Sequence, residues 1–251
     1  MIITGATSGI GKGAALEMAK RKWSLVLTGR NAEAMKEIAE ECKKLGAEKV
    51  TYTLGDLTDP SVAKKIVDHA LKEFGKIDCL VNNAGMLVTG NLEEAKDDLT
   101  DFDAQMEGNV KTVVRLTKVA LPHIIKSKGT IVNVSSVCGT NSTPAAFYYC
   151  MSKSALDQFT KCLAMELAGK GVRVNSVNPG VIYSEIQRRS GQSEDTYQKY
   201  LERSKLTHPM GRVGYPEETA KAIAFLASDD SSFTTGELLK VDGGRAIYTF
   251  D

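Results

Sequence analysis

Short apolar strands alternate with amphipathic helices along the whole 251-residue chain, and this alternation limits its possible folds more than any other feature. The predicted strands cover residues 2–3, 24–27, 50–54, 79–81, 130–134, 172–177 and 238–241. The predicted helices cover residues 11–22, 32–45, 60–74, 102–125, 147–167 and 217–227. This order predicts an α/β fold, with one parallel sheet of about seven strands and helices on both faces. Right-handed crossovers then give a doubly wound, Rossmann-like sheet.

One long polar stretch interrupts the alternation at about residues 183–214. It is rich in Arg, Ser, Gln and Glu, and a short helix is indicated at 194–204. An insertion of this size between a strand and the next helix is usually a lid or a disordered loop. We therefore expect a single domain over residues 1–251, with the 183–214 segment as a substrate lid.

Composition excludes several classes of protein. The chain is 42% hydrophobic and 25% charged, which is ordinary for a globular protein. Its net charge of +1 gives no reason to expect binding to nucleic acid or to an acidic membrane surface. Its apolar runs are far shorter than the roughly 20 residues of a membrane span, and no signal peptide is visible. We expect a cytoplasmic protein.

The cysteines and histidines form no recognisable site. The five cysteines are an odd number without a Cys-x-x-Cys pair, so the sequence predicts neither a metal site nor structural disulfides. Free thiols fit a reducing compartment. The three histidines are scattered, and we interpret them as ordinary surface or packing residues.

A glycine-rich turn, Thr-Gly-Ala-Thr-Ser-Gly-Ile-Gly at residues 4–11, follows the first strand and opens the first helix. Few residues precede it, so either this strand is short or the natural chain begins upstream. Glycines permit a tight turn and the close approach of a pyrophosphate to the positive end of a helix. A plain turn from strand to helix is the alternative, but this position in an alternating chain favours a dinucleotide site.

The end of the second predicted strand distinguishes between two dinucleotides. An acidic residue there binds the ribose 2′-hydroxyl of NAD, whereas a nearby arginine suits the 2′-phosphate of NADP. This chain reads Leu-Thr-Gly-Arg-Asn at residues 27–31, so Arg30 is available and no acid is present. Because a guanidinium binds phosphate strongly, the sequence predicts NADP(H) rather than NAD(H).

Tyr149 and Lys153 lie four residues apart in a predicted helix, so their side chains share one face. An ammonium this close to a phenol favours the phenolate and lowers the pKa of the tyrosine from about 10. A phenol that titrates nearer neutral pH can give a proton to a developing alkoxide or take one from an alcohol. The spacing alone also suits a surface aromatic beside a solvated lysine, and the neighbouring motifs decide between these interpretations.

Taken together, the motifs resemble those of the short-chain dehydrogenase/reductase family over essentially the whole chain. In the family's order they are Thr4-Gly5-x-x-x-Gly9-x-Gly11, Asn82-Asn83-Ala84-Gly85, Asn109, Ser136, Tyr149-x-x-x-Lys153 and Asn178-Pro179-Gly180. Ser136 lies thirteen residues before Tyr149, which is the family spacing. Strand alternation points the neighbouring Ser135 in the opposite direction. Joint occurrence of these motifs by chance is negligible.

The resemblance implies a catalytic tetrad of Asn109, Ser136, Tyr149 and Lys153. Tyr149 would be the general acid in reduction and the base in oxidation. Lys153 would lower the pKa of Tyr149 and bind the nicotinamide ribose, and Ser136 would hydrogen-bond the substrate carbonyl. Asn109 would hold a water that links Lys153 to solvent. Tyr148 lies off the Lys153 face, and we assign it to the pocket wall.

The resemblance also implies the contacts to the cofactor. Asp56 is similar to the acid that contacts adenine, and Ile182 and Ser184 lie where the family holds the nicotinamide carboxamide. The full set is Gly5, Thr7, Ser8, Gly9, Ile10, Gly11, Arg30, Asp56, Leu57, Asn83, Ala84, Gly85, Tyr149, Lys153, Pro179, Gly180, Ile182 and Ser184. Family members that prefer NADP often carry a basic residue at the Ser8 position, so here the preference rests on Arg30. No metal is expected.

The function implied is an NADP(H)-dependent oxidoreductase that interconverts a carbonyl and a secondary alcohol. The motifs fit 3-oxoacyl reductases, sugar dehydrogenases and steroid or xenobiotic carbonyl reductases alike. Expected pocket walls are Cys138, Thr140, Phe147, Tyr148 and the segment 181–210. Basic residues in the 183–214 segment would serve an acidic acyl carrier or, as we favour, form a solvated lid face.

Two other classes of protein share parts of this pattern. A non-catalytic NADP(H)-binding scaffold would keep the glycine turn, but it has little use for Ser136, Tyr149 and Lys153 together. A methyltransferase that uses S-adenosylmethionine usually has an acid at the end of its second strand. The family resemblance also implies a homotetramer, or else a homodimer, in which the helices carrying Asn109 and Tyr149 pair across a two-fold axis.

Overall fold

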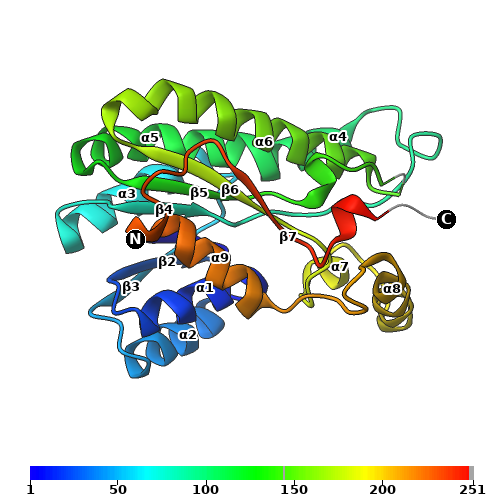
Figure 1. Cartoon of the computed structure of the whole chain (residues 1–251), viewed down its shortest axis with the longest axis horizontal. Helices are drawn as coiled ribbons and strands as arrows, with labels where there is room; N and C mark the ends of the chain where they lie inside the picture. Colours follow the sequence, from blue (N-terminus) through cyan, green and yellow to red (C-terminus); the bar gives the residue numbers. More distant parts are fainter. Residues whose placement is uncertain (144, 249–251) are drawn as a thin grey trace.

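The computed structural model describes residues 1–143 and 145–248, and its centre is one sheet of seven parallel strands (Figure 1). Their order is β3-β2-β1-β4-β5-β6-β7. The strands are β1 (Ile2–Thr4), β2 (Leu25–Gly29), β3 (Val50–Leu54), β4 (Cys79–Asn82), β5 (Thr130–Val134), β6 (Arg173–Pro179) and β7 (Leu238–Val241). The short β1 is central and pairs with β2 on one side and β4 on the other. The strand order reverses there, as the predicted doubly wound fold requires.

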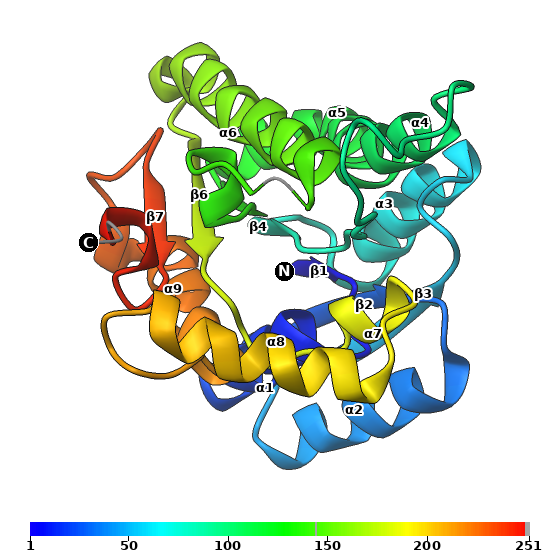
Figure 2. The same cartoon turned by 90° about the vertical axis from the view of Figure 1, so that its right-hand side faces the viewer.

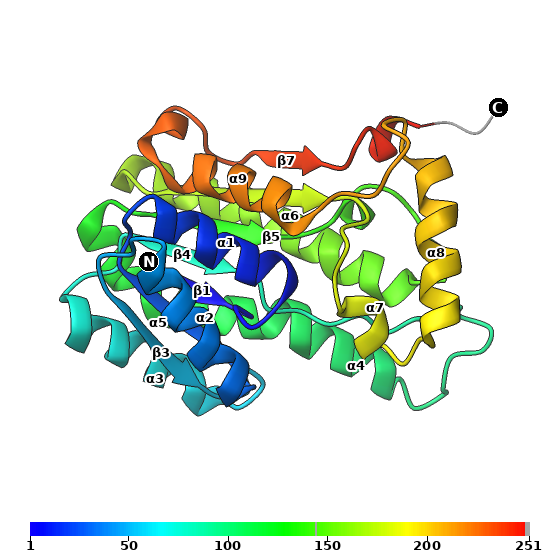
Figure 3. The ribbon, with the colours of Figure 1, turned by 90° about the horizontal axis from the view of Figure 1, so that it is seen from below.

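Helices cover both faces of the sheet (Figures 1 and 3). One layer contains α1 (Gly9–Lys20), α2 (Ala32–Lys44) and α9 (Pro216–Ala227). The other layer contains α3 (Pro60–Phe74), α5 (Thr112–Ser127) and α6 (Phe147–Leu167). Short 3-10 turns lie at η2 (Val137–Gly139), η3 (Ala168–Lys170), η4 (Asp229–Ser231) and η5 (Arg245–Ile247). The predicted fold class is therefore confirmed.

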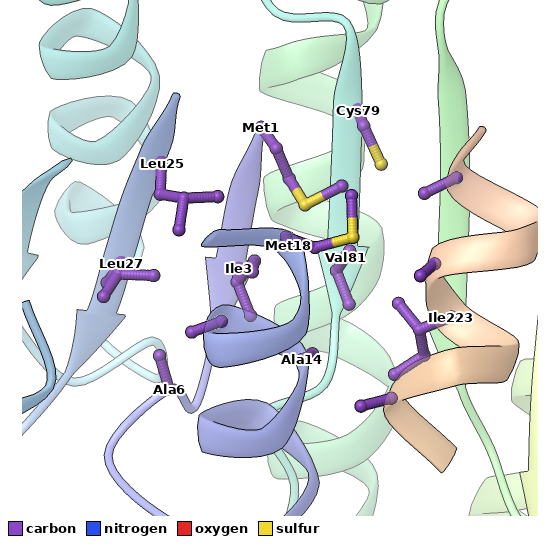
Figure 4. Packing of buried hydrophobic residues seen from close by; sticks show 14 of the residues in the cluster. Met1, Ile3, Ala6, Ala14, Met18, Leu25, Leu27, Cys79, Val81 and Ile223 are labelled. Atoms are coloured by element: carbon purple, nitrogen blue, oxygen red, sulfur yellow. The ribbon is translucent and has the colours of Figure 1, made fainter. Parts of the chain in front are cut away.

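The strands are apolar on both faces, because each face packs against a helical layer. Ile3 lies in one core cluster with Met18 of α1 and Ile223 of α9 (Figure 4). The preceding Ile2 points the other way, into the cluster that contains Ile66 of α3. This explains the near-continuous apolar runs that mark strands of a parallel sheet. No helix in the described part of the chain is long and apolar enough to cross a membrane.

The structure differs from the prediction in two segments. The predicted helix 102–125 is continuous but changes winding: α4 (Thr100–Met106) passes through a π-helical turn, η1 (Glu107–Lys111), into α5. The 183–214 segment contains α7 (Ile186–Arg189), which was not predicted, and α8 (Glu194–Thr207). Tyr197 and Leu201 of α8 are buried against Val181 and Val213. This segment therefore packs around a small apolar cluster that it shares with Val181, and it is not a disordered loop.

Candidate active site

The carboxyl ends of β1, β4, β5 and β6 meet at one edge of the sheet, beside α7 and α8 (Figure 2). The predicted residues follow these ends: Asn83 comes after β4, Ser136 after β5 and Gly180 after β6. Ligands of open parallel sheets bind at this edge, where the strand order reverses. The fold thus gathers motifs that are far apart in the sequence.

The turn between β1 and α1 is compact because its glycines leave no room for side chains. Gly5 has a φ of +64°, and a Cβ there would lie 2.9 Å from Asn83 Nδ2. A Cβ on Gly11 would collide with the Gly5 carbonyl oxygen and with the Asn83 amide. The turn is therefore folded directly onto the segment that follows β4.

Thr4 and Asn83 hold these two segments together. Thr4 Oγ1 accepts hydrogen bonds from the backbone N–H groups of Asn83 (2.8 Å) and Ala84 (2.9 Å). In return, Asn83 Nδ2 donates to the carbonyl oxygens of Thr4 (2.8 Å) and Gly5 (3.2 Å). One hydroxyl and one amide thus join two segments that were each predicted to bind the cofactor.

The start of α1 has the features that a dinucleotide pyrophosphate requires. Ser8 is the N-cap residue, but its side chain makes no capping hydrogen bond, and the first turn contains no acidic residue. The first N–H groups of α1 therefore keep their capacity to bind an anion, which the helix dipole also favours. Together with the glycines, this turn fits the NAD(P)(H) that the motifs predict.

The end of β2 carries a cation, as predicted, but one that is paired. Arg30 Nη1 lies 3.2 Å from Asp56 Oδ2, and both side chains are exposed. Thr58 donates hydrogen bonds to Asp56 Oδ1 from its N–H (3.0 Å) and its hydroxyl (2.8 Å). These bonds, the backbone one first, hold the pKa of Asp56 below its usual value. Asp56 is therefore ionised and offsets part of the Arg30 charge.

Tyr149 and Ser136 lie side by side between α6 and the end of β5. Ser136 is buried, and its hydroxyl lies near enough to the Tyr149 phenol to lower the pKa of that phenol. The same oxygen accepts a 3.1 Å hydrogen bond from the Cys138 N–H, because Ser136 is the N-cap of η2. The serine that was predicted to bind a carbonyl is therefore next to the predicted acid/base.

Burial, not Lys153, governs the acidity of Tyr149 in this structure. Desolvation raises the pKa of the phenol above its usual value, Cys138 adds to the increase, and the hydrogen bond with Ser136 opposes it. The Lys153 ammonium lies 5.5 Å from the centre of the Tyr149 ring. The prediction of a lowered pKa is therefore wrong here, because spacing alone does not account for desolvation.

Lys153 is a buried cation anchored to the sheet. Its Nζ donates a 2.9 Å hydrogen bond to the carbonyl oxygen of Val134, the last residue of β5. Burial lowers the pKa of Lys153 to about 8, although Asp157 opposes this change. A lysine with this pKa can exchange a proton near neutral pH, as a relay requires.

Asn109 is buried in η1 and joins the segment after β4 to α6. Its Oδ1 accepts a hydrogen bond from the Met86 N–H (2.8 Å), and its Nδ2 donates to Met86 O and to Ser152 Oγ (3.0 Å each). Gly85 lies between Asn109 and Lys153, since a Cβ there would be 3.1 Å from Asn109 Oδ1 and 3.8 Å from Lys153 Nζ. Asn109 is thus beside the site, and its role in a water relay stays a prediction.

The structure adds three polar residues that the sequence analysis did not include as site residues. Asp157 on α6 accepts hydrogen bonds from Asn178 Nδ2 (3.0 Å to each carboxylate oxygen). Asn178 Nδ2 also donates to the Ser136 carbonyl oxygen (3.0 Å), and Ser135 Oγ donates to the Lys153 carbonyl oxygen (3.3 Å). Burial raises the pKa of Asp157. The signal for Asp157 was its spacing, since it lies one more helical turn along the face of Tyr149 and Lys153.

The predicted contacts after β6 lie where the 183–214 segment begins. Gly180 is closely packed, since a Cβ there would lie 2.9 Å from both Asp242 Cα and His208 Nε2. Ile182 forms an isolated parallel bridge with Gly214. The Ser184 carbonyl oxygen accepts a 3.0 Å hydrogen bond from the Tyr197 hydroxyl. Ile182 and Ser184 thus connect the sheet edge to α8.

His208 has a packing role, as we interpreted it. Its Nε2 accepts a hydrogen bond from the Val181 N–H (3.1 Å), and its Nδ1 donates to the Ser204 carbonyl oxygen (2.6 Å). Burial lowers the pKa of His208, in agreement with a neutral ring that has one donor and one acceptor. In the described residues, no three His, Cys, Asp or Glu side chains come together to hold a metal.

The remaining predicted residues lie around this edge. Tyr148 is buried against Phe102 of α4, with ring centres 5.4 Å apart, and its hydroxyl has no partner within the described ranges. With Phe147 it borders a small cavity of about 50 Å³. Ile10 and Leu57 are partly buried against the two core clusters.

Comparison with known proteins gives a consistent result over the whole chain. A family model described as "Enoyl-(Acyl carrier protein) reductase" matches residues 5–246. The chain is 38% identical to the 3-oxoacyl-(acyl-carrier-protein) reductase FabG of Thermotoga maritima, covering 98% of this chain and 97% of that protein. It is 36% identical to the meso-2,3-butanediol dehydrogenase of Serratia marcescens, covering 97% and 93%.

A solved structure agrees with these relatives. The crystal structure of a short-chain dehydrogenase/reductase of unknown function from Caenorhabditis elegans, determined with cofactor, superposes with a TM-score of 0.91. The two sequences are 35% identical, and the match covers 99% of this chain and 95% of the other.

The buried Lys153 predicts a pH-dependent stability. Its pKa in the folded protein, about 8, lies below the unfolded value of 10.5, so the unfolded chain binds more protons between these values. The contribution of neutral Lys153 to the free energy of unfolding is therefore fully present above the unfolded pKa. It is lost as the pH falls through the folded pKa and the buried amine takes up a proton. The free energy of unfolding of the wild type, relative to Lys153→Met, should rise across this window by up to about 3 kcal/mol.

Urea unfolding of both proteins without cofactor, at about pH 7.5 and about pH 10, measures this difference. The exposed Lys161 on the same helix provides the matched variant, Lys161→Met, which should give no pH-dependent difference. If the free energies of unfolding of the wild type and Lys153→Met differ by the same amount at both pH values, the lowered pKa of Lys153 is contradicted.

Proposed function

Because this chain belongs to the short-chain dehydrogenase/reductase family and is an oxidoreductase of carbonyl and secondary alcohol groups, we propose that Tyr149, Ser136, Lys153 and Asn109 form its catalytic site. The observation that carries this proposal is that the Tyr149 phenol lies beside the buried Ser136 hydroxyl, with the Lys153 ammonium 5.5 Å from the centre of the tyrosine ring. Two hydroxyl groups in contact can bind one carbonyl oxygen, one of them holding it and the other supplying a proton. The bound nicotinamide would supply the hydride.

Proton transfer in this site starts from a protonated phenol. Burial keeps the pKa of Tyr149 above its ordinary value, so the phenol carries its proton at neutral pH and can donate it to the oxygen of a reduced carbonyl. Lys153, with a pKa of about 8, has its ammonium 5.5 Å from the centre of the tyrosine ring and can take part in returning a proton to the phenol. Both observations support the reductive direction.

We further propose NADP(H) as the cofactor, and two arginines support this choice. Arg30 follows β2, at the position that faces the adenosine ribose in this fold. Since Asp56 pairs with it at 3.2 Å, Arg30 alone would leave little net positive charge for a phosphate dianion. A second cation is therefore needed at this place, and α7 supplies a candidate.

Arg189, the last residue of α7, reaches the glycine turn. Its Nη2 donates a 2.8 Å hydrogen bond to Ser8 Oγ, although 181 residues separate the two in sequence. The adjacent Thr7 contacts Gly29, next to Arg30, since a Cβ on Gly29 would lie 2.8 Å from Thr7 Cγ2. In the described part of the chain, no carboxylate pairs with Arg189. Arg189 can thus provide the positive charge that the Ser8 position lacks in this sequence.

We propose a small carbonyl compound as the substrate, with the 183–214 segment as a lid of the single domain. Most cations of this segment are paired with neighbouring carboxylates. Arg188 binds Glu194, with Nε and Oε2 2.7 Å apart, and Lys199 binds Asp195 at 2.6 Å. Lys205 is likewise 2.6 Å from Glu202. An acidic acyl carrier would require unpaired cations, so this pattern favours a solvated lid face.

We also propose a homotetramer of D2 symmetry, because two separate surfaces expose large apolar side chains. On the outer face of α6, Met151 and Met165 are 49% and 85% exposed. A surface hollow of about 570 Å³ on α4 and η1 includes Met106 and Val110. Near β7, Phe233 is fully exposed. Two different two-fold interfaces would bury these two surfaces, whereas a dimer would bury one.

The Tyr149→Phe substitution tests the catalytic assignment. It removes the proton donor, so kcat should fall by about 10²- to 10⁴-fold, whereas NADPH binding, followed by its fluorescence, should remain. Tyr148→Phe is the matched control: the Tyr148 hydroxyl has no partner among the described residues, so most turnover should survive. Turnover near the wild-type value in Tyr149→Phe would refute the assignment.

The Arg189→Gln substitution tests the cofactor assignment. Loss of one charged contact to phosphate should weaken NADPH binding roughly 10-fold, from about 1.5 kcal/mol, and leave NADH binding unchanged. Dissociation constants for both dinucleotides, measured by fluorescence, give the result without any substrate. Arg203→Gln, which removes the same charge from the exposed face of α8, should change neither constant. Equal or tighter binding of NADH by the wild type would overturn the NADP(H) proposal.

The Met165→Glu substitution tests the assembly. A carboxylate at this exposed position would have to lose water in the interface, so the variant should sediment as a smaller species than the wild-type tetramer. Leu45→Glu, at an exposed position that ends α2 in the other helical layer, should leave the tetramer intact. A monomeric wild type would contradict the proposal.

A further inference from the structure

Two of the five free cysteines flank the candidate catalytic pair. Cys138 comes two residues after Ser136, and Cys150 directly follows Tyr149. Both are partly exposed, unlike Cys42 and Cys79, which are buried in the core. The fifth, Cys162, lies on the exposed side of α6. The proton-transfer chemistry proposed above uses none of these thiols.

The thiols of Cys138 and Cys150 both approach the same residue, Thr143. Cys138 Sγ lies 3.7 Å from the Thr143 hydroxyl oxygen, and Cys150 Sγ lies 3.9 Å from the Thr143 carbonyl oxygen, so the two sulfurs are neighbours. Twelve residues separate them in sequence, so the fold creates this pair.

The packing of η2 against α6 places the two thiols. Ser154 Oγ of α6 donates a 2.8 Å hydrogen bond to the carbonyl oxygen of Gly139 in η2. Gly139 has no room for a side chain, since a Cβ there would collide with the Asp157 carboxylate. These contacts between η2 and α6 fix the position of Cys138 in η2 relative to Cys150 in the first turn of α6.

The two thiols have different reactivity. Hydrogen bonds from the Cys150 and Ser136 side chains and the Arg245 charge hold the pKa of Cys138 well below that of a free thiol, whereas the same pairing raises the pKa of Cys150. Burial raises the pKa of Cys42 and of Cys79 to about 12. A partly exposed thiolate beside a second thiol is the arrangement found in oxidation-sensitive pairs.

We propose that Cys138 and Cys150 are a reversible oxidation site, at which a hydroperoxide such as hydrogen peroxide forms a disulfide beside Tyr149. The Cys138 thiolate attacks one peroxide oxygen, the O–O bond breaks, and hydroxide leaves, which gives a sulfenic acid at Cys138. The Cys150 thiol then attacks that sulfur and displaces the hydroxyl as water. Two thiols are oxidised, one peroxide is reduced to two waters, and a dithiol reductant reverses the change.

The disulfide would act on the catalytic pair through short connections. The sulfurs must move from their non-bonded separation to a bond of about 2.05 Å, which displaces η2 relative to the first turn of α6. Ser136 Oγ accepts a hydrogen bond from the Cys138 N–H and also contacts the Tyr149 phenol, so this movement disturbs both. The oxidised form should therefore lose activity. Only this consequence rests on the proposed function.

Mass spectrometry of the full-length protein tests the disulfide directly. Because no Lys or Arg lies between residues 129 and 152, trypsin leaves both cysteines in one peptide, 129–153. After treatment with equimolar hydrogen peroxide and then N-ethylmaleimide, this peptide should carry no maleimide and should weigh two hydrogen atoms less than its reduced form. Dithiothreitol before the maleimide should restore two labels. Recovery of the peptide with both thiols labelled after peroxide would overturn the proposal.

Two variants sharpen this test. Cys150→Ser removes the second thiol, so peroxide should leave a sulfenic acid at Cys138 that dimedone traps and no disulfide. Cys162→Ser removes an exposed thiol from the same helix and should leave the disulfide unchanged. Carbonyl reduction by the wild type should fall at least about 10-fold as the disulfide forms, a loss of about 1.4 kcal/mol, and recover with dithiothreitol. The peptide mass is measured without any substrate. The oxidation proposal can therefore be tested even if the protein shows no reductase activity.

Discussion

One buried amide, that of Asn178 in β6, connects the parts on which the candidate site depends. Its Nδ2 donates to the Ser136 carbonyl oxygen and to both carboxylate oxygens of Asp157, all at 3.0 Å. These contacts join β6, the segment after β5, and α6. An unsatisfied buried polar group costs about 1–3 kcal/mol, so these partners hold one another firmly in place. Asp157 also lies near enough to Lys153 to oppose the fall in its pKa. The positions of the serine, the lysine and, through α6, the tyrosine follow from this one amide.

Much of this arrangement could be predicted because it is local in sequence. The apolar runs gave the strands and the helical periodicity gave the covering layers, with several boundaries correct to the residue, as at β3 and α6. The edge at which Asn83, Ser136 and Gly180 gather follows from parallel strands alone. The spacing between Tyr149 and Lys153 correctly placed both on one side of α6, since Lys153 Nζ faces the tyrosine ring.

The features that could not be predicted depend on tertiary packing. The pKa of Tyr149 rises because protein surrounds the phenol, and no spacing rule contains that information. The contact between Arg189 and Ser8 bridges 181 residues, and Cys138 and Cys150 are neighbours only because η2 packs on α6. The cysteine count, an odd number without paired spacing, even pointed away from such a pair. Helical periodicity could have predicted Asp157 as a site residue, because it lies one turn after Lys153. An acid one turn beyond a lysine is, however, equally typical of a solvated surface.

The contact between α7 and the glycine turn has a consequence for the order of events in turnover. Ser184 approaches Gly9 so closely that a Cβ on Gly9 would lie 3.3 Å from Ser184 Cβ, and Arg189 bonds Ser8 at the same turn. If the dinucleotide binds at this turn, as proposed, its exchange requires this part of the 183–214 segment to move away and return. The opening rate of the segment would then set an upper limit on the rate of cofactor exchange, and a substrate that bound under the same segment would enter after the dinucleotide and leave before it.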